Sequence, residues 1–526
     1  MELLIFMEVG VRIVGIILRV LNFLLAPLFW LCARNRMRIP PVTDSLLLRS
    51  ATDIAEAIRK GELTSKEVVI KYITRLQEVN PLLNAVVDER YRDALNDASE
   101  VDRMISEARM KGGLEKLFAD KPFLGVPCTI KESCSLAGLS NSVGCLEHAG
   151  RRAPEDGAAV RLVKKAGAIP LLVSNTPELC LGWETTNLLR GTTNNPYCLN
   201  RTAGGSSGGE AALLASGASP FSVASDIAGS IRIPAAFCGV YGHKPTPGII
   251  PIEGHIPTLT DENYPKFLTV GPMTRFASDL APLLKVMAGD KASLLELDKP
   301  VKIDQLKVYY MCEATSSVAL LPVADCIQSA VAQAAHLLRD RGAALQAEKF
   351  TELEDSVEMS ISVFFAMKDI PNMLQDPANP KQDKSLFLEL LKVLFGGGTR
   401  SMQALGFALL KNSQLYIPQA ALPKYRQKAA RLRQMMTEKL GDTGVLLYPV
   451  HSSQAHLHRQ VFLRASGVLY SMLLNVLGLP AAAVPLGTCR GLPVAVQVIA
   501  GPNQDRLCLA VAKELEKGFG GWRPAP

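Results

Sequence analysis

Two clusters of glycine and serine in one short stretch carry side chains that could form the site of a hydrolase. The stretch Gly204–Pro234 reads GGSSGGEAALLASGASPFSVASDIAGSIRIP. In its first cluster, 204–209, the absence of bulky side chains lets backbone amides approach a ligand closely. In its second cluster, 226–232, a serine follows a turn of small residues whose N–H groups can converge on one point. Serine hydroxyls beside such donors suggest nucleophilic catalysis with a stabilised oxyanion.

Three interpretations of these clusters compete. A flexible linker is disfavoured because apolar helical and strand-like sequence follows each cluster immediately. A phosphate loop of Walker type ends in Gly-Lys-Ser/Thr, whereas the first cluster ends in Gly-Gly-Glu. The run 204–208 also fits G-x-S-x-G, which would make Ser206 the nucleophile of an α/β-hydrolase with a histidine base. Of the seven histidines, His451, His456 and His458 lie late enough in the chain for that role.

A lysine at the end of an apolar segment is a third candidate for chemistry. The segment 122–132, PFLGVPCTIKE, is predicted to form a buried strand that ends in Lys131. An ammonium group is costly to bury, so Lys131 is expected either to be paired or to be held as a neutral amine. The competing interpretation is a lysine whose ammonium group reaches solvent along its alkyl stem.

Three linked motifs resemble the amidase signature hydrolases. They are Gly125–Lys131 (GVPCTIK), Gly204–Glu210 (GGSSGGE) and Asp226–Arg232 (DIAGSIR), in that order. The similarity extends from about Ser50 to the C-terminus, where 491–497 (GLPVAVQ) resembles the closing strand motif of the family. Within the family the sequence most resembles the fatty-acid amide hydrolases, in particular their second, shorter, membrane-anchored type.

The resemblance implies a Ser-Ser-Lys triad. Ser230 would be the nucleophile and Lys131, neutral at rest, the ultimate base. Ser206 would carry protons between them and on to the leaving amine, and the peptide before Ser206 is expected to be cis. A lysine held near neutrality can accept a proton at physiological pH.

The resemblance also implies an oxyanion hole in the second motif. Backbone N–H groups of Ile227, Ala228 and Gly229, together with that of the nucleophile, are expected to face the developing charge. Ala228 stands where the family usually has glycine, which is harmless only if its φ is not positive. Asp226 and Arg232 are expected to form a structural ion pair across the turn.

Length and composition favour one large α/β domain. The chain has 526 residues, 48% of them hydrophobic and 20% charged, which is ample for a sizeable core. No linker-like tract or repeat divides it after residue 50, so we expect a catalytic domain at 41–526 behind an anchor at 1–40. A helix within 156–173 leads into the strand sequence IPLLV, a β/α alternation. The resemblance implies a large mixed, twisted β-sheet surrounded by α-helices.

Another helix is predicted from a capping pattern. Thr64 and Glu67 form a capping box, and apolar residues recur at helical spacing up to an expected stop at Asn80 and Pro81.

Charge and cysteine usage exclude several classes of function. The net charge is +7, and the basic residues are scattered over the predicted helices instead of forming a continuous basic patch. We therefore assign no nucleic-acid partner. Eleven cysteines stand singly, which argues against a disulfide framework or a metal site, and the triad implies no cofactor. The cysteines that flank the motifs are interpreted as small buried hydrophobes instead of thiol nucleophiles: Cys128, Cys134, Cys145, Cys180 and Cys238.

The N-terminal segment is predicted to attach the protein to a membrane. Residues 9–33 are apolar except for Arg12, Arg19 and Asn22, and are long enough to cross a bilayer. A signal peptide fits poorly, and an interfacial or lipid-droplet anchor is the alternative to a spanning helix. The arginines of 34–38 follow the segment, so the positive-inside rule places the catalytic domain on the cytoplasmic side.

Two further segments bear on lipid contact. Residues 384–412 form two apolar helical stretches around a Gly-Gly-Gly break, and are either a membrane-dipping cap, as the resemblance implies, or a buried hairpin. Residues 425–440 are predicted to form a basic amphipathic helix, either a solvated surface or a contact for anionic headgroups.

The sequence therefore predicts a membrane-bound serine hydrolase that cleaves long-chain fatty-acid amides, primary amides or N-acylethanolamines, to free acid and ammonia or amine. A small-amide amidase, an amidotransferase-type subunit and a catalytically weak lipid-amide-binding protein are the alternatives. The expected partners are the lipid amide and an internal membrane or lipid-droplet surface, and a homodimer is left open.

Overall fold

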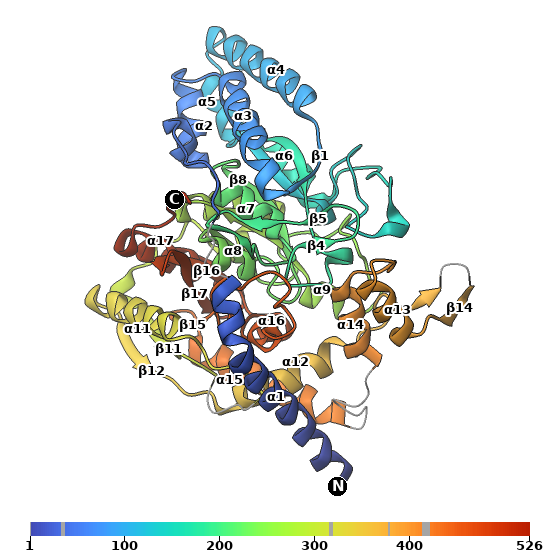
Figure 1. The fold of residues 1–526 in the computed structure, drawn as a ribbon. Helices are drawn as coiled ribbons and strands as arrows, with labels where there is room; N and C mark the ends of the chain where they lie inside the picture. Colours follow the sequence, from blue (N-terminus) through green and yellow to red (C-terminus); the bar gives the residue numbers. More distant parts are fainter. Residues whose placement is uncertain (1, 33–36, 315–318, 377–378, 413–420, 526) are drawn as a thin grey trace.

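An eleven-stranded sheet runs through the computed structural model (Figure 1). The structure describes residues 2–32, 37–314, 319–376, 379–412 and 421–525. The strand order is β1-β3-β2-β8-β10-β9-β16-β17-β15-β11-β12. These strands are β1 Val86–Glu89, β2 Pro127–Lys131, β3 Ile169–Ser174, β8 Phe221–Asp226, β9 Tyr241–Lys244, β10 Thr269–Thr274, β11 Lys307–Tyr310, β12 Ala344–Ala347, β15 Gly444–Pro449, β16 Ala481–Cys489 and β17 Leu492–Ala500.

The sheet is mixed. Strand β2 runs parallel to both β3 and β8, and β11 runs parallel to both β12 and β15. The remaining neighbours are antiparallel. Every residue of β2, β3, β8, β10, β15 and β17 is buried, which requires cover on both faces of the sheet.

Helices supply that cover, and α7, α8, α10, α11 and α17 pack directly on the strands. The helices are α1 Glu2–Cys32, α2 Ala51–Lys60, α3 Ser65–Leu83, α4 Tyr91–Met110, α5 Leu114–Asp120, α6 Ala158–Lys165, α7 Gly208–Ala215, α8 Arg232–Cys238, α9 Tyr264–Phe267, α10 Leu280–Ala288, α11 Asp325–Asp340, α12 Ser356–Phe364, α13 Leu386–Leu394, α14 Met402–Asn412, α15 Leu422–Leu440, α16 Leu469–Val476 and α17 Asp505–Phe519. The predicted fold class, a large mixed sheet surrounded by helices, is confirmed.

Helix α3 begins as predicted but ends later. The capping box is present, with the Thr64 side chain accepting from the Glu67 N–H and the Glu67 carboxylate accepting from the Thr64 N–H. The helix runs on through Pro81 to Leu83, beyond the expected stop. Leu83 is fully buried, and the Asn80 side chain accepts the N–H of the two residues that follow the helix cap. Packing therefore outweighs the one hydrogen bond that the proline removes.

The predicted strand over 122–132 is shorter than expected, because β2 starts only at Pro127. A turn precedes it, in which the Val126 N–H donates to the Phe123 carbonyl at 3.0 Å. Gly125 sits in this turn at φ +80°, where a Cβ atom would lie 2.8 Å from the Ser65 side chain. The helix and strand predicted within 156–173 are present as α6 and β3.

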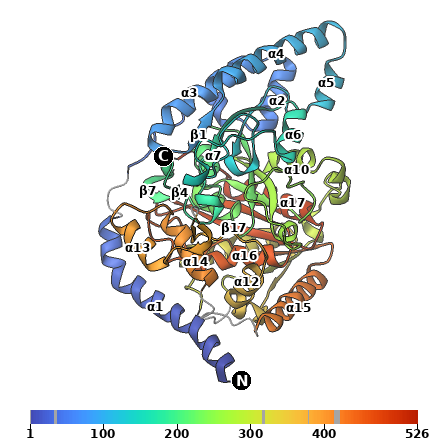
Figure 2. The ribbon, with the colours of Figure 1, turned by 90° about the vertical axis from the view of Figure 1, so that its right-hand side faces the viewer.

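Helix α1 extends from the body at the end opposite α4 and α5 (Figure 1, Figure 2). Its part Arg12–Cys32 is long and apolar enough to cross a membrane, and 6% of the most apolar window is buried. Two polar side chains tie it to the body: Arg19 donates to the Leu320 carbonyl at 2.6 Å and Asn22 to that of Leu463 at 2.9 Å. Arg34 and Arg36, on which the predicted orientation depends, lie outside the described residues.

The segment 384–412 forms two helices, as predicted, α13 and α14. They take part in a small apolar cluster in which Leu405 of α14 packs with Leu179 and Met373. Their outer side still exposes large apolar side chains, with Phe387 68% and Leu388 54% exposed. The hairpin is thus partly buried and partly an exposed apolar surface. The predicted basic helix is present as α15.

Candidate active site

The carboxyl ends of two adjacent strands bring the predicted residues together. Strands β2 and β8 are parallel, with Ile130 opposite Val223, so both end at the same edge of the sheet. Lys131 is the last residue of β2 and Asp226 the last of β8. The loop before α7 holds Ser206 against this edge.

Lys131 and Ser206 are in direct contact. The Nζ of Lys131 lies 2.7 Å from the Oγ of Ser206, and the lysine is fully buried. Its other contacts are the Oγ of Ser225 at 2.9 Å and the carbonyl of Ser225 at 3.3 Å. The hydrogen-bond partners of this amine among the described residues are therefore neutral oxygens. The lysine does not reach solvent along its stem.

The Ser206 loop touches the turn that carries Ser230. The N–H of Ser207 donates to the Ser230 carbonyl at 3.2 Å, and the Ser207 hydroxyl to the Ser225 carbonyl at 3.3 Å. Ser206 and Ser230 are 1% and 3% exposed. The peptide before Ser206 is cis, as the resemblance implies. Glycine is required at 205, since a Cβ there would lie 2.9 Å from the Gly182 carbonyl.

Glu210, which opens α7, is buried beside the lysine strand. Its carboxyl group accepts a hydrogen bond from the Thr129 hydroxyl, two residues before Lys131 on β2. Burial raises the pKa of Glu210 to about 7, against the opposing effect of hydrogen bonds such as that from Thr129. The family glutamate therefore serves as a buried support for the strand that holds the lysine.

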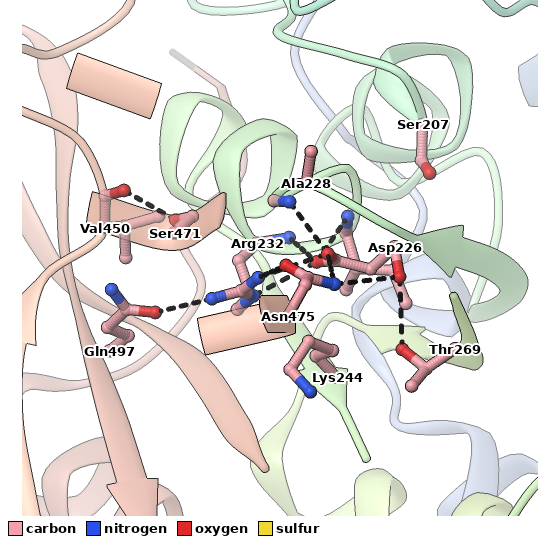
Figure 3. Close-up of polar contacts among 12 residues, drawn as sticks. Ser207, Asp226, Ala228, Arg232, Lys244, Thr269, Val450, Ser471, Asn475 and Gln497 are labelled. Carbon is pink, nitrogen blue, oxygen red and sulfur yellow. Dashed lines mark hydrogen bonds and ion pairs between the residues drawn. The ribbon is translucent and has the colours of Figure 1, made fainter. Parts of the chain in front are cut away.

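Asp226 fixes the turn between β8 and α8 (Figure 3). Its carboxylate accepts the N–H of Gly229 at 2.8 Å and that of Ile231 at 3.1 Å. It also pairs with Arg232 through two hydrogen bonds of 3.0 and 3.1 Å, with both side chains fully buried. The predicted ion pair is confirmed. Burial alone would raise the pKa of Asp226, but the charge and hydrogen bonds of Arg232 outweigh it and hold the pKa far below its usual range.

Two residues far away in the sequence complete this network. Arg232 donates to the side-chain oxygens of Asn475 at 2.7 Å and Gln497 at 3.0 Å (Figure 3). Asn475 in turn donates to the Asp226 carboxylate at 2.9 Å. The sequence alone predicts neither role. Only Gln497 stands out in the sequence, because it is a polar residue in the middle of an apolar strand and therefore needs a buried hydrogen-bond partner.

The turn presents three candidate oxyanion residues, Ile227, Ala228 and Gly229. The Gly229 N–H is directed at Asp226 in this structure, so it would have to be shared with an oxyanion. The Ala228 carbonyl accepts from the Trp183 indole at 3.2 Å, which orients that peptide. Ala228 is not among the described non-glycine residues with positive φ, whereas Gly229 has φ +95°. The methyl group of Ala228 is therefore accommodated without backbone strain.

A pair of substitutions tests this assignment of the turn. We expect Ala228→Gly to change kcat/KM by less than about threefold, because no strained dihedral is relieved. We expect Gly229→Ala to lower it about a hundredfold, since a Cβ atom would lie 2.7 Å from both Ile233 and Ser471 at a φ that disfavours alanine. Steady-state kinetics on both purified variants provide the measurement. Equal losses in the two would contradict the assignment.

The histidines suggested by G-x-S-x-G have other partners. Among the contacts of the described residues, none joins His451, His456 or His458 to Ser206 or Ser230. They contact instead Ser453, the Leu457 carbonyl and Glu184, respectively. A histidine that the sequence analysis passed over, His255, lies near the lysine, with Ser225 between them.

The cysteines that flank the motifs are poor candidates for a nucleophile. Cys128, Cys134, Cys145 and Cys238 are buried as predicted, whereas Cys180 is only half-buried. Burial raises the pKa of Cys134 to about 12. The thiolate form that attacks a carbonyl is thereby suppressed. All eleven cysteines are free thiols.

Comparisons with known proteins match this site to a family. The family model described as Amidase matches residues 67–509. Fatty-acid amide hydrolase 2-B of Danio rerio is 39% identical over 530 residues, covering 98% of each chain. Fatty-acid amide hydrolase 2 of Homo sapiens is 39% identical over 489 residues, covering 92% of this chain and 91% of its own. A solved structure titled fatty acid amide hydrolase has the same fold, with a TM-score of 0.73 at 21% identity, covering 90% of this chain and 86% of that one.

Proposed function

Because the chain belongs to the amidase signature family, we propose that it is a serine hydrolase that cleaves long-chain fatty-acid amides to the free acid and ammonia or an amine. The observation that carries this proposal is the 2.7 Å contact between the Nζ of Lys131 and the Oγ of Ser206, two side chains that are both buried. Near-full-length similarity to relatives named fatty-acid amide hydrolase 2 supports the substrate class.

In the first half-reaction, Ser230 attacks the amide carbonyl. Its proton passes to Ser206, whose own proton passes to the neutral amine of Lys131. Charge develops on the carbonyl oxygen, where the N–H groups of Ile227 and Ala228 would stabilise it, one such donor being worth about 10²–10³ in rate. The resulting ammonium of Lys131 returns a proton through Ser206 to the leaving nitrogen.

In the second half-reaction, water replaces the amine and attacks the acyl-Ser230 ester. Ser206 and Lys131 remove a proton from the water in the same way, and Ser230 regains its proton when the acid leaves. Ser230 forms and releases the acyl bond, and Ser206 and Lys131 carry the protons to the leaving nitrogen and from the water, so the scheme calls for neither a metal nor a cofactor.

Membrane attachment fits a substrate with a long acyl chain. We propose that α1 anchors the protein, as a spanning or a monotopic helix, with the catalytic domain on the cytoplasmic side of an internal membrane or lipid droplet. The exposed apolar side of α13, with Phe387 and Leu388, would contact the same lipid phase. A homodimer is compatible with this proposal.

Substrate chain length tests the proposed function. We expect amide hydrolysis by the purified full-length protein in detergent to increase from propionamide to oleamide, because the acyl chain supplies binding energy. Release of ammonia is the measurement, and Ser230→Ala is expected to abolish it. Hydrolysis of short amides alone would contradict the assignment of a lipid substrate but not the proposed triad. No hydrolysis of any amide would favour a lipid-binding protein.

A further inference from the structure

A buried polar cluster lies beside Lys131, joined to it through Ser225. The Oγ of Ser225 is 2.9 Å from the lysine Nζ and 2.9 Å from the Nε2 of His255. The Nδ1 of His255 lies 3.2 Å from the Pro257 carbonyl and 3.1 Å from the Tyr264 hydroxyl. Ser225, His255 and Tyr264 are 2%, 4% and 4% exposed. The mechanism above assigns no role to this cluster.

The contacts at Nδ1 decide which ring nitrogen of His255 carries the proton. A backbone carbonyl can only accept, so the Nδ1 facing Pro257 must be the N–H. The Tyr264 hydroxyl gives its own proton to the same carbonyl, which leaves its oxygen free to accept from Nδ1 as well. Nε2 is then an acceptor. The hydrogen bond from Nδ1 to the Pro257 carbonyl therefore sets the tautomer of His255, as commonly happens for functional histidines.

The ring is also uncharged. Burial lowers the pKa of His255 to about 3, and the Pro257 carbonyl opposes this only in part. A proton taken up by Lys131 during the reaction would add repulsion in the same direction. Tyr264, which faces Nδ1, also stays neutral, because burial raises its pKa well above its usual range. The ring therefore stays neutral throughout the working pH range.

An acceptor at Nε2 fixes the direction of the remaining hydrogen bonds. The Ser225 hydroxyl donates to His255, and its lone pairs are left to accept an N–H from Lys131. The competing partner of that hydroxyl, the Oγ of Ser133, is farther away at 3.4 Å. The Ser225 carbonyl accepts the second N–H of the amine.

A neutral amine has two N–H bonds and one lone pair, and both N–H bonds are now used. The lone pair is left facing the hydroxyl of Ser206, 2.7 Å away. With the proton on Nε2 instead, His255 would donate to Ser225, and the Ser225 hydroxyl would turn toward the lysine and compete with Ser206 for its lone pair.

We propose that His255 is a positioning residue, which acts through Ser225 to aim the lone pair of Lys131 at Ser206. This inference rests on the proposed function, since it presupposes that Lys131 is the base. His255 itself touches neither substrate nor the reacting atoms.

The test compares two replacements of the ring in the full-length enzyme. We expect His255→Phe, which keeps the ring volume but removes the acceptor, to lower kcat about 10- to 100-fold with KM nearly unchanged, because only the alignment of the base is lost. His255→Gln can return an amide oxygen to the position of Nε2, and we expect it to recover most of that loss. Oleamide hydrolysis and the rate of Ser230 labelling by a fluorophosphonate are the two readouts.

His451→Phe is the matched control, because it also replaces a buried imidazole but lies outside this cluster, and we expect it to keep kcat within about threefold. Thermal unfolding shows whether each variant folds. Should His255→Phe be unfolded, Ser225→Ala takes its place, because it removes the hydroxyl that links the ring to the lysine amine, and we expect the same loss of kcat and of labelling rate. A folded Ser225→Ala enzyme with unchanged kcat and labelling rate would then overturn the inference.

Two outcomes overturn the inference. One is a folded His255→Phe enzyme with unchanged kcat and labelling rate. The other is a Gln variant no better than the Phe variant. A wild-type enzyme without activity on any amide, but with normal folding, would instead count against the proposed function.

Discussion

Replacement of Lys131 by methionine is expected to lower kcat about 10³- to 10⁴-fold and leave the fold intact. Methionine keeps the length of the side chain but supplies no lone pair that can take a proton from Ser206, and a general base contributes up to about 10⁴-fold. The measurement is kcat for oleamide hydrolysis. Since the proposed mechanism places Lys131 and Ser206 in one proton relay, we expect the Lys131→Met/Ser206→Ala enzyme to be scarcely slower than either single variant.

Lys244 provides a matched control for that substitution. It too is a fully buried lysine on a sheet strand, but its amine contacts only a backbone carbonyl among the described hydrogen bonds, that of Pro245. Burial, and then the charge of Arg232, lowers the pKa of Lys244 to about 7. Its ammonium is thus disfavoured in the fold, a destabilisation that is greatest below pH 7 and disappears as the pH rises past 10.5.

We therefore expect Lys244→Met to keep kcat and to raise Tm more at pH 6 than at pH 10. If Lys244→Met lost as much activity as Lys131→Met, the assignment of Lys131 as the base would be wrong. The loss would then follow from replacing any buried lysine in this sheet.

Asp226→Asn is expected to destabilise the enzyme by about 3–5 kcal/mol, because it leaves the buried guanidinium of Arg232 without its counter-ion. Activity should fall too, since the carboxylate also accepts the N–H groups of Gly229 and Ile231 on either side of Ser230. Urea unfolding in detergent measures the free energy. Because the pKa of Asp226 is lower in the folded protein than in the unfolded chain, the ion pair stabilises the fold at pH values above the usual pKa of aspartate. This stabilisation is lost as the pH falls toward the lowered pKa.

An exposed ion pair gives the control for this experiment. Asp298 pairs with Lys285, with side chains 83% and 54% exposed, and Asp298→Asn should change stability by less than about 1 kcal/mol. The Asp226→Asn/Arg232→Met enzyme should be more stable than the sum of the two single losses predicts, because no charge is left unpaired. An Asp226→Asn enzyme as stable as the exposed control would contradict the role given to the network.

Residues of the proposed site could be predicted from the sequence where they lie close together along the chain. Ser206 and Ser230 lie in one stretch, the Asp226–Arg232 pair brackets a single turn, and Lys131 ends a readable apolar strand. These features are local, so they form short motifs, and the resemblance of those motifs to a known family suggests their roles. The fold class followed from the same local patterns and the family resemblance.

What the sequence did not reveal is how distant residues meet. Asn475 and His255 occur in ordinary surroundings, and no spacing relates them to the turn or to the lysine. Their roles arise because α16 reaches the end of β8 and because the loop after β9 folds back over the ends of β8 and β2. The length of α3 was underestimated for a similar reason, since the burial of Leu83 is a tertiary effect.

The chain order of the network around Arg232 has a consequence for biosynthesis. The anchor and all three proposed catalytic side chains emerge from the ribosome in the first half of the chain, but Asn475 and Gln497 emerge near its end. Until then the guanidinium lacks two of its acceptors, and β17 has not joined the sheet. A prematurely terminated chain is therefore expected to carry the complete proposed triad in its sequence and still to lack amidase activity.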